Sequence, residues 1–294
     1  MKTAIVTGGT GFVGMNLVEA LLQNDYSIYM TVRKNSIHNA RIPISDRITV
    51  VSADLDHIEL LKKINYKSKP EIFFHLAWPG AHNDFQTQYN NIDYTIRALN
   101  VAKEIGCRRF VCTGSQAEYG LYNEIMYEYL LPKPMTSYGA AKVAACQMSK
   151  NLASQLGIEW VWGRIFSVYG KYEPETTLLS YLHKSFINNE NPVLTKCEQN
   201  WDYLFSSDVA DAIIALAENG CSGEIYNIAN GNYKKLKNFV EDMKNNYVTK
   251  SNILYEKNVP YVVSLSPSIS KIIKDTGWIP KVKFSEGIKV YNEV

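Results

Sequence analysis

The sequence predicts an α/β fold in which a doubly wound parallel sheet carries a smaller, mixed α/β cap toward its C-terminal end. Three observations support this prediction. Short β-branched runs alternate with longer helical patterns over the first 170 residues, as they do in βαβ units. Runs such as Ile72-Phe73-Phe74 are continuously apolar, which is typical of strands covered on both faces. Beyond Gly170 the alternation becomes irregular.

Strands and helices are expected to alternate in chain order through the first half. Periodicity predicts strands at Thr3–Thr7, Ser27–Arg33, Ile48–Ser52, Ile72–Leu76, Arg109–Thr113 and Glu159–Ile165. The helices between them are expected at Gly11–Gln23, His57–Lys63, Tyr89–Ile105 and Ser137–Leu156. The second half predicts helices at Leu178–Asn188, Ser207–Glu218, Leu236–Asn245 and Pro267–Lys274, and a strand at Gly223–Ile228.

The change in pattern also predicts how the chain divides. Residues 1–170 are expected to form the sheet domain, with residues 203–230 returning to it. Residues 171–202 and 231–294 are expected to form a substrate-binding cap. The cap would lie over the carboxyl edge of the sheet, where ligands of open α/β sheets bind.

Composition excludes several classes of protein. The chain of 294 residues is 46% hydrophobic, so it is not mainly disordered. Lys and Arg number 31 against 29 Asp and Glu, a net charge of +2, which argues against nucleic-acid binding. No apolar run approaches the roughly 20 residues of a membrane span, and no signal peptide is recognisable, so a soluble, cytoplasmic protein is expected. Five scattered cysteines form no metal or disulfide pattern.

A glycine-rich segment directly follows the first predicted strand and opens the first helix. Its sequence is Thr7-Gly8-Gly9-Thr10-Gly11-Phe12-Val13-Gly14, a G-x-x-G-x-x-G spacing. Gly8 permits a tight turn, Gly11 lets the backbone approach a pyrophosphate, and Gly14 lets the helix pack closely on the sheet. The helix N-terminus favours an anion. We interpret the segment as a dinucleotide site, the alternative being a glycine-rich turn without a ligand.

The end of the second predicted strand bears on the choice of cofactor. NAD-binding proteins usually place Asp or Glu there, whereas this strand ends Thr31-Val32-Arg33-Lys34. A guanidinium can pair with a 2′-phosphate through charge-assisted hydrogen bonds. We therefore expect NADP(H) in preference to NAD(H). Binding of NAD(H) remains an alternative, as does the possibility that Arg33 only makes the strand end more soluble. Asp54 and Leu55 end the third strand, within reach of an adenine.

A Tyr-x-x-x-Lys pattern puts a phenol and an ammonium one helical turn apart. It occurs three times, but the span from Tyr129 contains a proline and the span from Tyr233 lies late in the chain among other lysines. The remaining pair, Tyr138 and Lys142, comes one element after Ser115, which is placed at the carboxyl end of a strand. Ligands of open α/β sheets bind at that edge, so we expect this pair to lie near a bound ligand; the alternative is an ordinary surface helix.

With these motifs the sequence resembles the extended short-chain dehydrogenase/reductases, specifically the NAD(P)-dependent nucleotide-sugar epimerase/dehydratase/reductase branch. The resemblance covers nearly the whole chain. Its residues are Thr7–Gly14, Asp54-Leu55, His75-Leu76-Ala77, Asn91, Ser115, Tyr138, Lys142, Arg164–Gly170, Asp202-Tyr203, Ser207–Ala210 and Gly277–Pro280. It implies a Rossmann-type fold, a nucleotide-sugar substrate and a homodimer paired through the helices at about Tyr89–Ile105 and Ser137–Leu156.

The resemblance also implies roles for individual residues. Tyr138 would be the acid–base, its pKa lowered by Lys142 and the nicotinamide, Lys142 would bind the nicotinamide ribose, and Ser115 would orient the substrate. The cofactor contacts it implies are Gly8, Thr10, Gly11, Phe12, Val13, Gly14, Arg33, Asp54, Leu55, Leu76, Ala77, Tyr138, Lys142 and Val168. The substrate contacts are Trp78, Ser115, Gln116, Tyr138 and Trp201.

Departures from the family pattern narrow the activity. The 4,6-dehydratases of the branch have an Asp-Glu pair where this chain has Gln116 and Ala117, while Glu118 is displaced by one residue and should point elsewhere. The 4-epimerases usually have an acidic residue where Arg33 stands. We therefore expect an NADPH-dependent reductase of a nucleotide-linked 4-keto-6-deoxyhexose, with Tyr138 as proton donor to the C4 oxygen. The alternatives are a nucleotide-sugar 4-epimerase and a catalytically inactive sensor of the same fold.

Two tryptophans depart from the pattern on the substrate side. Trp201 stands where many relatives have an Arg for the diphosphate, and Trp78 stands where relatives often have a small residue. Trp201 could stack on the ligand, and Trp78 could narrow the sugar pocket. The alternative for each is a half-buried packing residue.

Overall fold

A seven-stranded parallel sheet organises the chain, whose computed structural model describes residues 2–256 and 263–292. The strand order is β11-β6-β5-β4-β1-β2-β3. The bounds in that order are Glu224–Ile228, Glu159–Ile165, Arg109–Ser115, Ile72–His75, Lys2–Thr7, Tyr26–Val32 and Ile48–Ser52. The predicted doubly wound sheet is confirmed, and the strand order reverses between β1 and β4.

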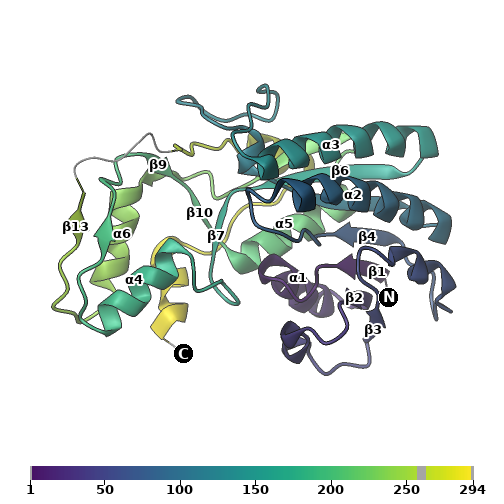
Figure 1. Cartoon of the computed structure of the whole chain (residues 1–294), viewed down its shortest axis with the longest axis horizontal. Coiled ribbons are helices and arrows are strands. Elements are labelled where there is room, and N and C mark those ends of the chain that lie inside the picture. Colours follow the sequence, from purple (N-terminus) through teal and green to yellow (C-terminus); the bar gives the residue numbers. More distant parts are fainter. Residues whose placement is uncertain (1, 257–262, 293–294) are drawn as a thin grey trace.

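Helices cover both faces of this sheet. On one face α1 (Phe12–Gln23) packs against α5 (Ser206–Asn219), and on the other α2 (Phe85–Ile105) lies beside α3 (Ser137–Leu156) (Figure 1). Strand β1 supplies both cores, because Ala4 and Val6 join the core under α1 and α5, whereas Ile5 joins the core under α2 and α3. Burial on both faces explains the continuous apolar strands.

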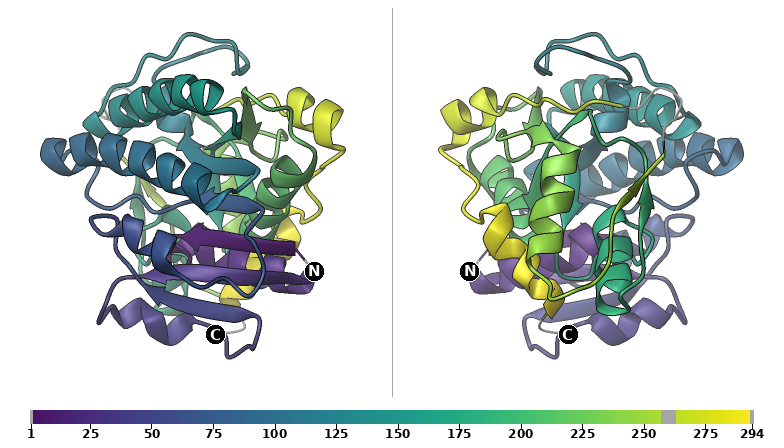
Figure 2. Two further views of the ribbon diagram at one scale, coloured as in Figure 1. Left: turned by 90° about the vertical axis from the view of Figure 1, so that its right-hand side faces the viewer. Right: turned by 90° about the vertical axis from the view of Figure 1, so that its left-hand side faces the viewer.

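The cap has a core of its own at the other end of the molecule. It contains the aromatic and aliphatic side chains of α4 (Leu178–Ile187) and α6 (Leu236–Asn245). Figure 2 shows α6 and the C-terminal segment in front of the sheet domain in its right-hand view. The remaining elements here are β7 (Ser167–Tyr169), β8 (Val193–Leu194), β9 (Asn200–Trp201), β10 (Tyr203–Phe205), β12 (Lys234–Lys235), β13 (Leu254–Tyr255), α8 (Phe284–Gly287) and η4 (Ile288–Asn292).

Part of the segment expected in the cap lies elsewhere. Helix α7 (Ser270–Thr276) packs against α5 and β11, and Ile272 and Trp278 are buried in the core of the sheet domain. The expected cap range 231–294 also includes residues 257–262 and 293–294, which lie outside the described residues.

Several element boundaries differ from the prediction for identifiable reasons. Helix α2 begins at Phe85 rather than Tyr89 because Asp84 caps it, accepting hydrogen bonds from the backbone N–H and the hydroxyl of Thr87. Helix α7 begins at Ser270 because Pro267 forms a β-bridge with Met126. The helix expected at His57–Lys63 is a 3₁₀ helix, η2 (Ile58–Lys63). Short 3₁₀ helices also occur at η1 (Ile37–Arg41) and η3 (Gln116–Glu118).

The described residues contain neither a membrane-spanning helix nor a metal-binding cluster. Among residues 2–256 and 263–292, no helix is both long and apolar enough to cross a bilayer. Within the same ranges, no group of three or more His, Cys, Asp or Glu side chains is placed to hold a metal ion.

Candidate active site

The glycine-rich loop between β1 and α1 lies against the chain that leaves β4. Gly8 has φ +73°, and a Cβ at this position would lie 2.5 Å from the backbone N of Ala77. A Cβ on Gly14 would lie 2.0 Å from the carbonyl oxygen of Gly8. Only glycine therefore fits either position. Helix α1 begins at Phe12, and its N-cap residue Gly11 provides no side-chain cap, so the first N–H groups of the helix are available to a diphosphate.

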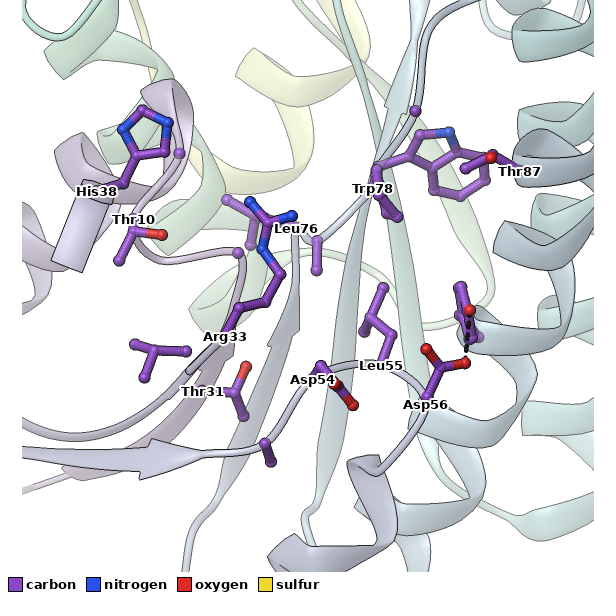
Figure 3. Close-up of a pocket in the computed structure, with 18 of the residues that line it drawn as sticks. Thr10, Thr31, Arg33, His38, Asp54, Leu55, Asp56, Leu76, Trp78 and Thr87 are labelled. Atoms are coloured by element: carbon purple, nitrogen blue, oxygen red, sulfur yellow. Dashed lines mark hydrogen bonds between the residues drawn. The ribbon is translucent and has the colours of Figure 1, made fainter. Parts of the chain in front are cut away.

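A first cavity, of about 630 Å³, runs from this loop across the ends of β2, β3 and β4. In Figure 3, Arg33 extends from the end of β2 toward Leu76, with Thr10 and His38 on one side and Trp78 on the other. We call it the outer cavity. The cofactor contacts predicted at this end all line it, namely Gly8, Thr10, Gly11, Arg33, Asp54, Leu55, Leu76 and Ala77.

The carboxylates of the outer cavity already have partners. Asp54 accepts hydrogen bonds from the backbone N–H of His57 at 2.9 Å and its ring Nδ1 at 2.7 Å. Asp56 accepts from the hydroxyl of Tyr94 at 2.7 Å. In contrast, the Arg33 guanidinium has no hydrogen-bond or ion-pair partner within residues 2–256 and 263–292. A cation is thus available in a cavity whose anions are engaged.

A second cavity, of about 320 Å³, brings the predicted catalytic residues together. Ser115 at the end of β5, and Tyr138 and Lys142 on α3, all line this inner cavity. Phe12, Val13 and Gly14 line it too, as expected for cofactor contacts. The two cavities share Gly8, Gly11, Leu76 and Trp78 in their walls. The glycine loop and the predicted catalytic residues therefore face one continuous cleft.

Tyr138 lies in the first turn of α3, which Thr136 caps by accepting from the N–H of Gly139. Its ring stacks on the imidazole of His82, with centroids 4.4 Å apart, a contact that the sequence did not predict. Burial raises the pKa of Tyr138, and the hydrogen bond with Ser115 opposes that rise. Lys142 is not among the groups that lower the pKa of Tyr138, contrary to expectation. The phenol is therefore protonated at neutral pH.

Lys142 is buried, with only 3% of its surface exposed. Its Nζ donates a hydrogen bond of 2.6 Å to the carbonyl oxygen of Thr113 and lies 3.5 Å from the centroid of the Trp78 ring. Burial lowers the pKa of Lys142 to about 8. The ammonium is thus charged at neutral pH but close to its titration range.

Three other predicted site residues lie outside both cavities. Gln116 is half-buried in η3, and Val168 in β7 packs against the core of the sheet domain. Trp201 in β9 packs between the cap core and a neighbouring cluster, and its ring lies 6.3 Å from that of Tyr203. The packing alternative fits Trp201 here, whereas Trp78 lines both cavities.

With this geometry in place, comparison with known proteins assigns the family. A family model described as "NAD dependent epimerase/dehydratase family" matches residues 4–229. The chain belongs to the NAD-dependent epimerase/dehydratase family. The glycine cradle and the inner cavity are the features through which this family member would hold a dinucleotide, and the residues present fit one.

Curated relatives of this family member span nearly its whole length. It is 26% identical to dTDP-D-glucose 4,6-dehydratase of Mus musculus, covering 98% of this chain and 87% of the relative. It is 25% identical to a putative UDP-glucose 4-epimerase of Methanocaldococcus jannaschii, covering 97% and 95%. The relatives thus include both a dehydratase and an epimerase.

Solved structures share the fold. A UDP-N-acetylglucosamine 4-epimerase from Methanobrevibacter ruminantium, in complex with UDP-N-acetylmuramic acid, superposes with a TM-score of 0.89 at 22% identity, covering 99% of this chain and 98% of that one. A UDP-glucuronic acid 4-epimerase from Bacillus cereus, in complex with NAD, gives a TM-score of 0.86 at 22% identity, covering 99% and 97%. At this identity the likeness concerns the fold.

A buried ion pair lies next to the end of β5, where Ser115 stands, in this family member. Glu118 accepts hydrogen bonds from the backbone N–H of Ser115 and from Nε1 of Trp162, both at 2.9 Å, and from Nε of Arg164 at 2.7 Å. Neither charged side chain is more than 2% exposed. As expected, Glu118 points away from the cavity, but its role in holding Ser115 was not predicted. The sequence contained one indication of this role, because Arg164 places a cation in β6, the strand next to β5.

Replacing Glu118 by Ala should lower the free energy of unfolding by about 3–5 kcal/mol, because Arg164 would be left buried and unpaired. Urea unfolding followed by circular dichroism measures the difference. Glu124→Ala, which removes an exposed carboxylate in the loop after η3, should change the free energy of unfolding by less than about 0.5 kcal/mol. A loss below about 1 kcal/mol for Glu118→Ala would contradict the assigned role of the ion pair.

Lys142 should also make stability depend on pH. Its folded pKa of about 8 lies below the unfolded value of roughly 10.4, so the unfolded chain binds more protons between these values. Relative to Lys142→Met, the wild-type chain should gain about 3 kcal/mol of unfolding free energy as pH rises from about 8 to about 10.5. Urea titrations of both proteins across this range measure the gain, and a constant difference would show that Lys142 is not held as described.

Proposed function

We propose that this chain is an NADPH-dependent reductase of a nucleotide-linked 4-keto-6-deoxyhexose. The observation that carries the proposal is the inner cavity, in which Ser115, Tyr138 and Lys142 face a glycine loop suited to a dinucleotide. Tyr138 and Ser115 would hold the ketone oxygen, and Lys142 would hold the cofactor's ribose. Gly8, Gly11 and the start of α1 would bind the diphosphate.

The proposed step is balanced by one hydride and one proton. NADPH, when bound, supplies the hydride to the C4 carbon of the sugar. Tyr138 gives its phenolic proton to the C4 oxygen as negative charge develops there, leaving a secondary alcohol on the sugar. Ser115 donates to the same oxygen and keeps it beside the phenol. Solvent then returns a proton to Tyr138.

The charge state of Tyr138 supports reduction. A reductase must begin with a protonated phenol, and burial raises the pKa of Tyr138, so the chain's own groups favour that form. Dehydration needs further acid–base groups at C5 and C6, but Gln116 and Ala117 have no titratable side chain. The carboxylate of Glu118 is engaged by Ser115, Trp162 and Arg164.

The preference for NADPH rests on the segment after β2. Arg33, Lys34, Asn35, Ser36, Ile37 and His38 enclose a surface hollow of about 330 Å³. Arg33 also lines the outer cavity, and it is the unpartnered cation described above. Guanidinium, ammonium and backbone donors around one hollow suit a 2′-phosphate.

A nucleotide-sugar 4-epimerase is the second candidate, and the relatives favour it. The fold likenesses to 4-epimerases and the Methanocaldococcus jannaschii relative support this alternative. One of those structures contains NAD. The same three residues would serve an epimerase, which first removes the C4 hydroxyl proton and later returns it. The two activities differ in whether NADPH is consumed.

We also propose a homodimer formed through α2 and α3. These helices lie side by side on the outside of the sheet in Figures 1 and 2. They carry exposed apolar side chains, among them Tyr89 at 61% and Met148 at 54% exposed. A second copy packed on this face would cover them.

The proposed activity is tested by supplying NADPH and a nucleotide-linked 4-keto-6-deoxyhexose. We expect one NADPH to be oxidised per hydroxy sugar formed. Tyr138→Phe should lower kcat by about 10²–10⁴-fold with little change in the Kd of NADPH. Tyr129→Phe, at the exposed tyrosine of another Tyr-x-x-x-Lys pattern, should behave as wild type.

Two outcomes would contradict this proposal. Interconversion of 4-hydroxy epimers without net NADPH oxidation would identify the epimerase. Undiminished turnover by Tyr138→Phe would reject Tyr138 as the proton donor.

The cofactor preference is tested at Arg33. Arg33→Asp should lower the ratio of kcat/KM with NADPH to kcat/KM with NADH by roughly 10–100-fold, because a charge-assisted hydrogen bond is replaced by repulsion. Lys67→Asp makes a similar charge change in the loop before β4, at the opposite edge of the sheet, and should leave the ratio unchanged. An unchanged ratio in Arg33→Asp would reject the 2′-phosphate assignment.

A further inference from the structure

We propose that Trp78 is a positioning residue whose indole, with the rings of Trp162 and Tyr138, forms an aromatic cage that holds the Lys142 ammonium at the inner cavity. The catalytic meaning of this cage rests on the proposed function, but the contact itself does not. The cage joins residues from three separate elements: the segment after β4, strand β6 and helix α3.

The geometry singles out Trp78. Nζ of Lys142 lies 3.5 Å from the centroid of the Trp78 ring, and 5.9 Å from the ring centroids of both Trp162 and Tyr138. A cation within about 6 Å of an aromatic face is attracted to it, most strongly when the ring is that of Trp. Trp78 provides the closest of these three contacts.

The ammonium needs such partners because it is buried without a carboxylate in ion-pair contact among the described residues. Among residues 2–256 and 263–292, no carboxylate forms an ion pair with Lys142, and Thr113 supplies its one backbone acceptor. Removing an ammonium from water is costly unless other groups replace the lost hydration. The ring faces of the cage supply that replacement without neutralising the charge, which stays available to the cavity.

Both tryptophans are held through their indole N–H groups. Trp78 Nε1 donates to Oε1 of Gln88 at 2.8 Å, and buried Gln88 in turn donates to the carbonyl oxygen of Ala81 at 2.9 Å. Trp162 Nε1 donates to Glu118 at 2.9 Å. Because the N–H groups are used at the ring edges, the ring faces remain free for the cation.

Trp78 also contacts the proposed proton donor. Its ring meets that of Tyr138 in a T-shaped arrangement, with centroids 6.2 Å apart. Helix α2, through Gln88, thereby fixes an indole that touches both Tyr138 and Lys142. This explains why a large residue stands at a position where the family often has a small one, since an alanine would leave the ammonium uncovered.

The neutral titratable groups around Lys142 do not change their protonation state between pH 7 and pH 10. On β4, burial lowers the pKa of His75 to about 3, and on β5 it raises the pKa of Cys112 to about 12. On α3, burial raises the pKa of Cys146 and of Tyr138. In η3, Glu118 is held in its ion pair with Arg164. Lys142 is therefore the member of this cluster whose charge changes over that range.

A double-mutant cycle tests the cage without turnover. Trp78→Leu keeps an apolar side chain but removes the aromatic face, and Lys142→Met removes the charge. Urea unfolding of the wild type, both single variants and the double variant gives their coupling. At pH 7 we expect a coupling of about tenfold or more in the unfolding equilibrium constant, falling below about threefold at pH 10, where Lys142 is neutral.

Trp78→Phe is the matched variant, because it keeps an aromatic face and loses the hydrogen bond to Gln88. It should retain most of the coupling at pH 7. A coupling below about twofold at pH 7, or one of equal size at both pH values, would overturn the cage, since simple packing does not depend on the charge of Lys142.

Activity supplies the second readout. In Trp78→Leu the pH above which kcat/KM falls should move down by about one unit, because the charged form of Lys142 loses a partner. Trp78→Phe should show a smaller shift. An unchanged pH profile alongside intact turnover would overturn the positioning role. If the cycle shows the coupling and no nucleotide 4-keto sugar is reduced, the cage stands and the proposed function fails.

Discussion

The close approach of the β1–α1 loop to the chain leaving β4 is the constraint on which the site depends. Strands β1 and β4 are neighbours in the sheet although some 65 residues separate them in sequence, and the chain order reverses between them. Gly8 lies so close to Ala77 that no side chain fits between them. The loops beyond this contact diverge to opposite faces of the sheet. The space between them is the cleft that the outer and inner cavities share.

Two buried charges near the end of β5 are satisfied in different ways. Glu118 and Arg164 neutralise each other, and the carboxylate holds the N–H of Ser115. The cation of Lys142 meets a carbonyl oxygen and aromatic faces instead of an anion. A carboxylate beside Lys142 would satisfy the ammonium but cancel its field at the cavity. Because the two arrangements are separate, Glu118 holds the backbone of Ser115 while the charge of Lys142 is not neutralised at the inner cavity.

Local patterns predicted much of this site, and long-range packing accounts for what they missed. The glycine loop, the strand ends and the Tyr138–Lys142 pair follow from spacing within one or two elements, so the sequence shows them directly. The contact of Trp78 with Lys142 depends on how the segment after β4 lies against α3, which no periodicity in the sequence records. The same applies to Gln116, Val168 and Trp201, which adjoin family motifs but lie outside both cavities. Whether such a residue lines a cavity depends on the packing of distant elements, which the local sequence does not show.

The protonation state of Tyr138 links these features to the direction of the proposed reaction. Oxidation of a sugar hydroxyl, the opening step of an epimerase, requires a phenolate, whereas reduction of a ketone requires the phenol. Burial in the cleft raises the pKa of Tyr138, and its hydrogen bond with Ser115 opposes that rise. Those conditions keep the phenol protonated before the reaction begins. An epimerase on this scaffold would have to form the phenolate before its first step, whereas the proposed reduction starts from the protonated phenol.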